Sequence, residues 1–309
     1  MKVVHVVPYL RLESAGPSYS VPALCKGLLD AGCDVSLCTS GGLPKKEYGF
    51  PLKDFAETFL PHPKFCRSPG LLRYLIDECK DVDIVCSNSA WTYVNVYPAW
   101  AKKRATFKLV SAPRGTMSEW AWNFHWPQKR LFGFYAQYAA FRATDMWHAT
   151  VEAEYDDIRR RGYRQPVMIL PNGVNLPHDI VAGTLARNRR RMLYLSRIHP
   201  TKNVDILLRC WSRLEAEFPD WDLSIVGPDK DNPYADEMKH LARCLGCKRV
   251  TFEGEVRGAA KYTFMADSEC EVLPTNTENF GMVVAEALAC GTPVICSQGA
   301  PWQGLQTNR

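Results

Sequence analysis

Two carboxylates, Glu278 and Glu286, lie on either side of an apolar run in the sequence TENFGMVVAEALACGTPVI, residues 277–295. Glu286 falls about one turn into a predicted helix, Met282–Cys290, and Glu278 falls in the loop before that helix. A carboxylate accepts two hydrogen bonds, so one such acid suits a vicinal diol such as a ribose, and a second could hold the hydroxyl groups of a sugar. Either acid alone has a structural explanation, as a surface residue or as a helix-entry acid. Their shared setting favours a ligand site.

The residues between these acids predict an anion site. A predicted strand ends in the sequence EVLPT, and the chain then turns into the helix. The backbone N–H groups of Phe280, Gly281 and Met282 therefore lie at a helix N-terminus, where they have no partner inside the helix and attract anions. Gly281 also lets a ligand approach the backbone closely. We expect an anionic group of the ligand at this helix end.

The elements that would position these residues alternate along the whole chain. Short apolar runs without strict alternation are separated by helical patterns, which indicates parallel strands covered by helices on both faces. In the first half, strands are predicted at Lys2–Tyr9, Asp34–Thr39, Asp83–Asn88, Lys108–Ala112, Met146–Ala149 and Val167–Leu170, and helices at Ser18–Asp30, Leu71–Lys80 and Glu152–Arg161. In the second half, strands are predicted at Arg191–Ser196, Asp222–Val226, Arg249–Glu253, Glu271–Pro274 and Pro293–Cys296, and helices at Asn203–Glu217, Asp236–Leu245, Ala259–Ala266 and Met282–Cys290.

This pattern predicts an α/β protein with two doubly wound, Rossmann-like domains, residues 1–172 and 191–309. The stretch between them is rich in Pro, Gly, Asn and Arg and has no period, so residues 173–190 are predicted to form the linker. Two such domains that face each other create a cleft at the carboxyl ends of both sheets, the usual ligand position in open α/β sheets.

The composition excludes several classes of protein. No apolar run reaches about eighteen residues, so no segment is predicted to span a membrane. The N-terminus, MKVVHVVPYL, has one lysine and no small-residue cleavage site, so it predicts a first strand rather than a signal peptide, in a cytoplasmic protein. The twelve cysteines are scattered, and only Cys244 and Cys247 form a C-x-x-C. Because a zinc site needs four ligands, we interpret the cysteines as small, mostly buried thiols.

The net charge of +5 is unevenly divided along the chain. Residues 1–171 carry 22 Lys and Arg against 16 Asp and Glu, whereas residues 172–309 carry 16 against 17. The basic first half indicates an anionic partner, but the excess is too modest for a nucleic acid, and no nucleic-acid-binding module is present in the pattern. The segment Ser118–Arg142 interleaves aromatic residues with Lys129 and Arg130. It could meet a bilayer surface or a lipid-linked acceptor, or it could pack as a partly buried helix on the first sheet.

Several segments together resemble one known family. ENFGMVVAE followed by ALACGTPVI resembles the E-x₇-E motif of glycosyltransferase family 4, retaining nucleotide-sugar transferases of the GT-B fold. LYLSRIHPTKNVDILL is similar to the family's strand–Arg-x₄-Lys–helix segment. The resemblance extends over nearly the whole chain, through AGPSYSVPALCKGLLDAGCDV, HATVEAEYDDI, ILPNGVN, LSIVGPD and VTFEGEV.

The resemblance implies a role for each matching residue of the second domain. Arg197 and Lys202 would contact the donor diphosphate. Their own setting agrees, because two cations before a helix can clamp a diphosphate, although an Arg-x₄-Lys pair alone also fits a solvated loop. Glu286 would hold the ribose, Glu278 and the amides of residues 280–282 would meet the transferred sugar, and Val256 would lie near the base. Neutralisation by Arg and Lys makes a divalent ion unnecessary, so we expect no metal and no cofactor.

Two residues of the first domain depart from the family's pattern. Gly16 lies in the loop after the first strand, where the family usually has Gly-Gly near the donor phosphates and this chain has Ala-Gly-Pro. Arg114, in SAPRGTM, stands where many members have a histidine, and it resembles a subgroup associated with bacterial surface polysaccharides. Arg114 could stabilise the leaving phosphate or bind an acceptor phosphate. The alternative is a structural Arg–carboxylate pair.

The resemblance implies transfer of a hexose from a UDP- or GDP-sugar to a glycan acceptor, with a lipid-linked acceptor favoured, and with retention of configuration. A second hypothesis is a catalytically silent binding or scaffold protein. It arises because family members continue beyond the position of Arg309, so the second domain is expected to be truncated. The four residues Arg197, Lys202, Glu278 and Glu286 favour an enzyme. A third hypothesis is a GT-B enzyme that isomerises nucleotide sugars.

Overall fold

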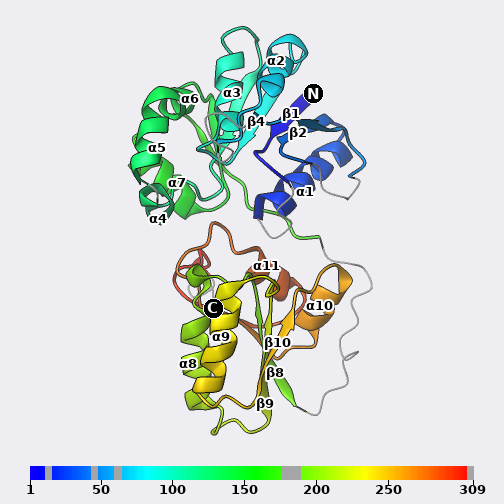
Figure 1. The fold of residues 1–309 in the computed structure, drawn as a ribbon. Helices are drawn as coiled ribbons and strands as arrows, with labels where there is room; N and C mark the ends of the chain where they lie inside the picture. The colour runs from blue at the N-terminus through cyan, green and yellow to red at the C-terminus, as the bar shows by residue number, and fades with distance from the viewer. Residues whose placement is uncertain (11–15, 43–47, 59–64, 125, 176–188, 305–309) are drawn as a thin grey trace. The chain divides into compact units, whose positions relative to one another are not determined.

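The computed structural model of the chain describes all residues except 11–15, 43–47, 59–64, 125, 176–188 and 305–309 (Figure 1). The chain divides into two compact units, unit 1 (Met1–Gly173) and unit 2 (Val174–Arg309). Most of the predicted linker, residues 173–190, lies outside the described residues.

Unit 1 contains a seven-stranded sheet of parallel strands in the order β3-β2-β1-β4-β5-β6-β7. The first strand lies inside the sheet, and the strand order runs outward from β1 in both directions, as in a doubly wound sheet. The strands are β1 (Lys2–Val6), β2 (Asp34–Ser40), β3 (Leu52–Phe55), β4 (Ile84–Asn88), β5 (Lys108–Ala112), β6 (Met146–Ala149) and β7 (Val167–Ile169). The sequence pattern does not predict β3, because this edge strand, LKDF, contains two charged residues and no apolar run.

Helices cover both faces of this sheet (Figure 1). They are α1 (Gly16–Asp30), α2 (Pro69–Asp77), α3 (Tyr93–Ala101), α4 (Glu119–Asn123), α5 (Trp126–Phe132), a π-helix η2 (Gly133–Gln137), α6 (Tyr138–Arg142) and α7 (Glu152–Arg160). Successive residues of a strand point to opposite faces. Accordingly, Val3 of β1 packs with Val21 of α1, whereas Val4 packs with Leu71 of α2. Such two-sided burial explains the continuous apolar run of β1.

Unit 2 repeats the plan with five parallel strands in the order β10-β9-β8-β11-β12. The strands are β8 (Arg190–Leu195), β9 (Trp221–Val226), β10 (Val250–Gly254), β11 (Cys270–Leu273) and β12 (Val294–Cys296). The helices are the 3₁₀ turn η3 (Pro200–Lys202), α8 (Val204–Leu214), α9 (Pro233–Cys244), α10 (Ala259–Ala266) and α11 (Met282–Ala289). Tyr194 of β8 packs with α8 and α9, and its neighbour Leu193 packs with α10 on the other face. The predicted α/β class with two doubly wound sheets is confirmed.

The carboxyl ends of the central strands of unit 2 approach each other closely at Gly227, which follows β9. A Cβ atom added to Gly227 would lie 2.1 Å from the carbonyl oxygen of Ser196, the residue after β8. The Gly227 N–H donates to the Gly254 carbonyl of β10 at 2.9 Å. Only a residue without a side chain fits there, and this contact fixes the backbone immediately before Arg197.

We predict that Gly227→Ala lowers the free energy of unfolding of unit 2 by about 1–3 kcal/mol, the cost of forcing extra atoms into a packed site. Scanning calorimetry of the chain measures this effect. Gly27→Ala is the matched control, because a Cβ at Gly27, inside α1, meets nothing within 4 Å. An equal effect of the two substitutions would contradict the prediction.

Candidate functional site

Two side chains predicted to bind the ligand contact each other in unit 2. Lys202 is the last residue of η3, which follows β8, and Glu278 lies in the loop after β11. The Lys202 ammonium forms an ion pair with Glu278 Oε1, and the two side chains are only 10% and 14% exposed. Because β8 and β11 are parallel neighbours, their carboxyl ends meet at one edge of the sheet. The sheet therefore brings together two residues that are 76 positions apart.

Hydrogen bonds join the two loops that carry this ion pair. The Thr201 carbonyl accepts from the Asn276 N–H at 2.9 Å and from the Thr275 hydroxyl at 3.2 Å. Asn203 has a φ of +52°, in the left-handed region that asparagine tolerates, and its side-chain amide donates to the Asn276 side-chain carbonyl at 2.7 Å. The geometry of the Lys202–Glu278 pair is thus fixed by the backbone on both sides.

Arg197 adds a second positive charge to this edge. The residue is exposed, and its carbonyl accepts a hydrogen bond from the buried Tyr194 hydroxyl at 2.9 Å. Partial burial, and then the charges of Arg197 and Lys202, lower the pKa of His199. Burial raises the pKa of Tyr194, on which the charges of Glu278 and Arg197 also act. Arg197 therefore acts on His199 together with Lys202, and on Tyr194 together with Glu278.

The N-terminus of α11 lies beside this edge. Gly281 is its N-cap residue with a φ of +76°, a conformation that glycine adopts readily. The Trp302 indole donates to the Phe280 carbonyl at 2.7 Å, and the two rings meet edge to face, with centroids 5.4 Å apart. The Glu278 N–H donates to the Gly299 carbonyl at 2.8 Å. The segment after β12 thus fixes the turn that leads into α11 at Met282.

Glu286 forms a second polar contact in unit 2. It lies four residues after Met282, the first residue of α11. Lys261 of α10 pairs with Glu286 Oε1 at 2.6 Å, and the side chains are 20% and 12% exposed. Lys261 is not among the site residues predicted from the sequence. A signal was present, since Lys261 is the one charged residue of the predicted helix Ala259–Ala266. Nothing in the sequence, however, identifies its partner.

A third acid, Glu271 of β11, lies near the Lys261–Glu286 pair. Its side chain is fully buried, and within the described ranges its carboxylate oxygens have no hydrogen-bond partner. Burial, and next the charge of Glu286, raise the pKa of Glu271 well above its usual value, while Lys261 opposes the shift. A raised pKa favours the protonated carboxyl, which leaves the Lys261 charge to Glu286.

In unit 1, Arg114 follows β5 and is 8% exposed, with a φ of +53°. It donates to the Asn172 side-chain carbonyl at 2.9 Å and to the Asn88 side-chain carbonyl at 3.2 Å. Burial lowers the pKa of Arg114, and the charge of Glu154 opposes this shift. Glu154 itself accepts from the Gly115 and Thr150 N–H groups at 2.7 and 2.8 Å. In the part of the chain that the structure describes, the Arg114 hydrogen bonds go to amides rather than to a carboxylate.

The other two predicted site residues are Gly16 and Val256. Gly16 was expected in a loop, but it is the first residue of α1, exposed, and a Cβ there would meet nothing within 4 Å. The helix begins earlier than predicted because Pro17 and Ser18 continue its first turn, where proline is tolerated. Val256 lies between β10 and α10, half-buried, and packs against a small cluster around Leu193 and Met265.

The structure also bears on metals and membranes. Among the described residues, no group of three or more His, Cys, Asp or Glu side chains could hold a metal ion. Cys244 of the C-x-x-C is exposed, with its sulfur 3.3 Å from His240 Nε2. No helix in the described ranges is both long and apolar enough to cross a bilayer.

Two protein-family models match the chain. The model described as Glycosyltransferase Family 4 matches residues 15–177, and the one described as Glycosyl transferases group 1 matches residues 179–303. A phosphatidyl-myo-inositol mannosyltransferase from Mycolicibacterium smegmatis is 33% identical over 133 residues, which are 41% of this chain and 33% of that protein. The chain spans between a third and a half of the length of the curated relatives it matches first.

Solved structures resemble the chain over nearly its full length. Anabaena Alr3699/HepE, in complex with UDP and glucose, superposes with a TM-score of 0.77 at 19% identity, over 99% of this chain and 83% of that one. The lipopolysaccharide outer core galactosyltransferase WaaB, in its apo form, gives a TM-score of 0.69 at 17% identity, over 97% and 81%. This similarity is one of fold, and it agrees with the predicted GT-B class.

We predict that Lys202→Met lowers the free energy of unfolding by about 3–5 kcal/mol, because it leaves the Glu278 charge buried without a partner. The double variant Lys202→Met/Glu278→Leu should recover most of that loss, since both charges are then gone. Calorimetry of the single and double variants measures the coupling.

The control is Lys26→Met, which removes an exposed ion pair with Asp30 and should cost about 1 kcal/mol or less. A Lys202→Met chain as stable as the Lys26→Met chain would show that the Lys202–Glu278 pair is not a buried structural contact.

Proposed function

The chain belongs to glycosyltransferase family 4, and from this premise we propose that it transfers a hexose from a UDP- or GDP-sugar to a glycan acceptor, with retention of configuration. The family model covers more than half of the chain, residues 15–177. The observation that carries the proposal is the buried contact between Lys202 and Glu278 at the carboxyl edge of unit 2. This contact brings a cation and a carboxylate together. The cation suits the diphosphate of a donor, and the carboxylate suits the hydroxyl groups of its sugar.

In this proposal each group at the edge of unit 2 binds one part of the donor. Lys202 turns from Glu278 toward the diphosphate, and the exposed Arg197 joins it. Glu278 then accepts hydrogen bonds from hydroxyls of the transferred sugar, beside the amides of residues 280–282. Glu286, held by Lys261, accepts from the ribose hydroxyls, and Val256 lies near the base. The diphosphate of the donor thus replaces Glu278 as the partner of Lys202, and the sugar hydroxyls replace Lys202 as the partner of Glu278.

The proposed reaction breaks the bond from the sugar C1 to the diphosphate oxygen and forms one from C1 to the acceptor oxygen on the same face of the sugar. The leaving phosphate oxygen takes the acceptor proton, so no protein nucleophile is required. Negative charge grows on the diphosphate as the bond breaks, and Arg197 and Lys202 stabilise it. The protein's contribution is thus positioning and charge stabilisation.

The proposed acceptor is a glycan of the cell surface, with a lipid-linked one favoured. Two similar proteins support this acceptor: WaaB is a lipopolysaccharide outer core galactosyltransferase, and the relative from Mycolicibacterium smegmatis is a phosphatidyl-myo-inositol mannosyltransferase. Arg114 of unit 1, a buried cation bonded to neutral amides, is the residue we assign to a phosphate of the acceptor or of the leaving group. Gly16, at the first turn of α1, would lie near the donor phosphates.

We predict that Glu286→Ala weakens donor binding by about 1.5–3 kcal/mol, the range for a hydrogen bond to a charged group. Isothermal titration calorimetry with UDP- and GDP-sugars measures it, and transfer assays with product analysis identify the sugar moved. Glu269→Ala is the control, because Glu269 is an exposed acid at the other end of β11. Equal affinities of the Glu286→Ala and parent chains would remove the ribose assignment. A donor converted to an epimer without an acceptor would favour an isomerase.

We also predict that transfer persists in excess EDTA, because Arg197, Lys202 and helix N–H groups neutralise the diphosphate in place of a metal ion. Turnover measured before and after chelation tests this point. Loss of activity that Mn²⁺ or Mg²⁺ restores would contradict it.

A further inference from the structure

Arg114 of unit 1 is a buried cation in an uncommon backbone conformation. It follows β5, is 8% exposed and has a φ of +53°, and the next residue, Gly115, has a φ of +81°. An arginine rarely adopts this left-handed region, and such a conformation persists only where the surrounding structure holds it. The groups that hold Arg114 therefore bear on its role.

Two asparagines hold the Arg114 guanidinium through their side-chain oxygens. Arg114 Nη1 donates to Asn172 Oδ1 at 2.9 Å, and Arg114 Nη2 and Nε donate to Asn88 Oδ1 at 3.2 and 3.4 Å. Asn88 is the last residue of β4, and Asn172 follows β7, so both amides lie at the carboxyl ends of strands of one sheet. A planar guanidinium that is bonded through three nitrogens is fixed in its plane and in its direction.

The orientation of the Asn88 amide follows from its other contacts. Asn88 is 1% exposed, and its side-chain nitrogen donates to the Val6 carbonyl at 3.2 Å and lies 3.3 Å from His5 Nδ1. Because a carbonyl oxygen only accepts hydrogen bonds, the Asn88 nitrogen must face β1. The Asn88 oxygen is thus left for Arg114.

The titratable side chains nearest to Arg114 are neutral, apart from one acid. Burial, and next the charge of Arg114, lower the pKa of His5 to about 3 and the pKa of His148 to about 4, so neither ring carries a charge at neutral pH. Burial raises the pKa of Cys25 and the pKa of Cys86 to about 12, so both thiols stay protonated. None of these four groups balances the Arg114 charge.

The acid is Glu154 of α7, whose charge opposes the lowering of the Arg114 pKa by burial. Its oxygens accept from the Gly115 N–H at 2.7 Å, the Thr150 N–H at 2.8 Å and the Thr150 hydroxyl at 3.0 Å. Within the described ranges, no carboxylate oxygen is hydrogen-bonded to the Arg114 guanidinium. A buried cation without a bonded counter-charge is costly, and an anionic ligand would remove that cost.

We propose that Asn88 and Asn172 are positioning residues, which aim the Arg114 guanidinium and, because they are neutral, leave its charge to a phosphate group of the ligand. This inference rests on the proposed function, in which Arg114 meets a phosphate of the acceptor or of the leaving group. An acid in place of either asparagine would still hold the guanidinium, but it would compete with the phosphate for the charge. The amides are therefore required for their neutrality as well as for their shape.

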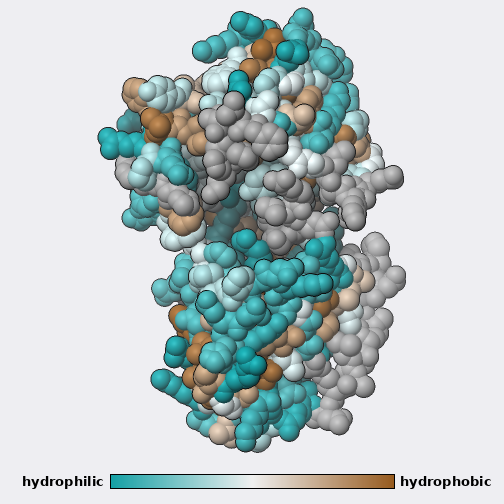
Figure 2. Space-filling model, viewed as in Figure 1, coloured by the Kyte–Doolittle hydropathy of each residue, from teal (hydrophilic) through white to brown (hydrophobic). Residues whose placement is uncertain are grey.

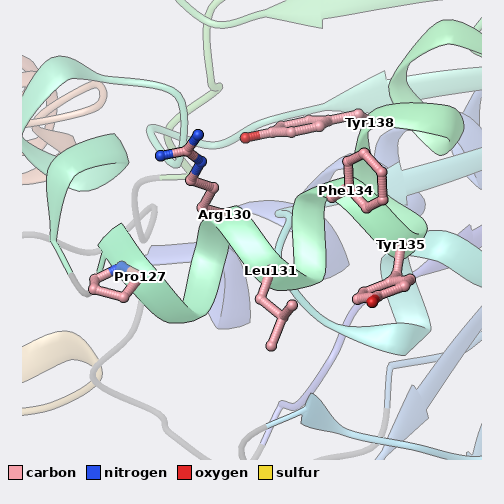
Figure 3. Close-up of a pocket in the computed structure, with 6 residues that line it drawn as sticks. All are labelled: Pro127, Arg130, Leu131, Phe134, Tyr135 and Tyr138. Atoms are coloured by element: carbon pink, nitrogen blue, oxygen red, sulfur yellow. The ribbon is translucent and has the colours of Figure 1, made fainter.

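Arg130, a second arginine of unit 1, has different surroundings. The segment from α4 to α6 exposes large apolar side chains, such as Phe134 (79%) and Tyr135 (74%), and Figure 2 shows hydrophobic surface over this part of unit 1. A π turn shifts the helical phase, so η2 separates these residues from Phe132 and Phe141, which are buried. A pocket of about 720 Å³ hollows the exposed side, lined by Pro127, Arg130, Leu131, Phe134, Tyr135 and Tyr138 (Figure 3). Arg130 is exposed, so water already solvates its charge.

The test compares thermal unfolding of the full chain with isothermal titration of inorganic pyrophosphate. Asn172→Asp keeps the shape and the oxygen of asparagine but adds a charge, whereas Asn172→Ala removes the oxygen and adds none. We expect the Asn172→Asp chain to melt at or above the temperature of the parent, because Arg114 gains a bonded counter-charge, and the Asn172→Ala chain to melt below it.

For pyrophosphate we expect the opposite order of the two variants. Affinity should fall about tenfold or more in Asn172→Asp, as in Arg114→Gln, because a charged hydrogen bond to the anion is lost, and it should fall less in Asn172→Ala. Arg130→Gln is the matched control, since it removes an exposed arginine of the same unit and should leave the affinity unchanged. Circular dichroism confirms that each variant folds.

Three outcomes would overturn the proposal. The first is a parent chain that binds no pyrophosphate, and the second is an Asn172→Asp or Arg114→Gln chain that binds it as tightly as the parent. The third is a larger loss of affinity in Asn172→Ala than in Asn172→Asp, because the amide would then act through its shape alone. These titrations involve no sugar transfer, so a failure of the proposed function is detected separately, as the absence of transfer from UDP- and GDP-sugars.

Discussion

The ion pair between Lys202 and Glu278 is the contact on which the site of unit 2 depends. Two charges withdrawn from water are costly unless each is the other's partner, so neither side chain can be lost alone without penalty. The pair is possible because parallel neighbours β8 and β11 end at one edge of the sheet. Hydrogen bonds from the Asn276 N–H and the Thr275 hydroxyl to the Thr201 carbonyl then fix the two loops. A ligand that offers a diphosphate and hydroxyl groups can satisfy both charges, and this property connects the fold to the proposed chemistry.

The second polar contact of unit 2, between Lys261 and Glu286, also pairs a cation with a carboxylate, but a third acid lies beside it. Glu286 has the cation Lys261 as its partner, and the neighbouring Glu271 is so deeply buried that its pKa is raised well above the usual value. With Glu271 protonated, one cation faces one carboxylate. Helices α10 and α11, which carry this pair, pack against each other on one face of the sheet. Helix packing therefore orients the acid that we assign to the ribose.

Unit 1 uses its polar and apolar residues differently. Arg114 is a buried cation whose described hydrogen bonds go to the amides of Asn88 and Asn172. Its charge is therefore less fully balanced than that of Lys202, which supports its assignment to a phosphate. The helices around η2 instead place apolar side chains in solvent beside cations. Unit 1 thus combines a buried cation with a separate exposed surface of apolar and basic side chains.

The sequence by itself determined the class of fold, because strands buried on both faces must be continuous apolar runs, and the predicted runs at Lys108–Ala112 and Met146–Ala149 coincide with β5 and β6. It also predicted Glu278, Glu286, Arg197 and Lys202 as site residues, because each of the two motifs that contain them is a short continuous segment of sequence. It could not identify β3, an edge strand with little to bury, nor Lys261 as the partner of Glu286, 25 positions away. Nor could it separate the buried from the exposed residues of α4 to α6, because the π turn sets their phase. Those features depend on how elements pack in three dimensions, which a one-dimensional pattern does not contain.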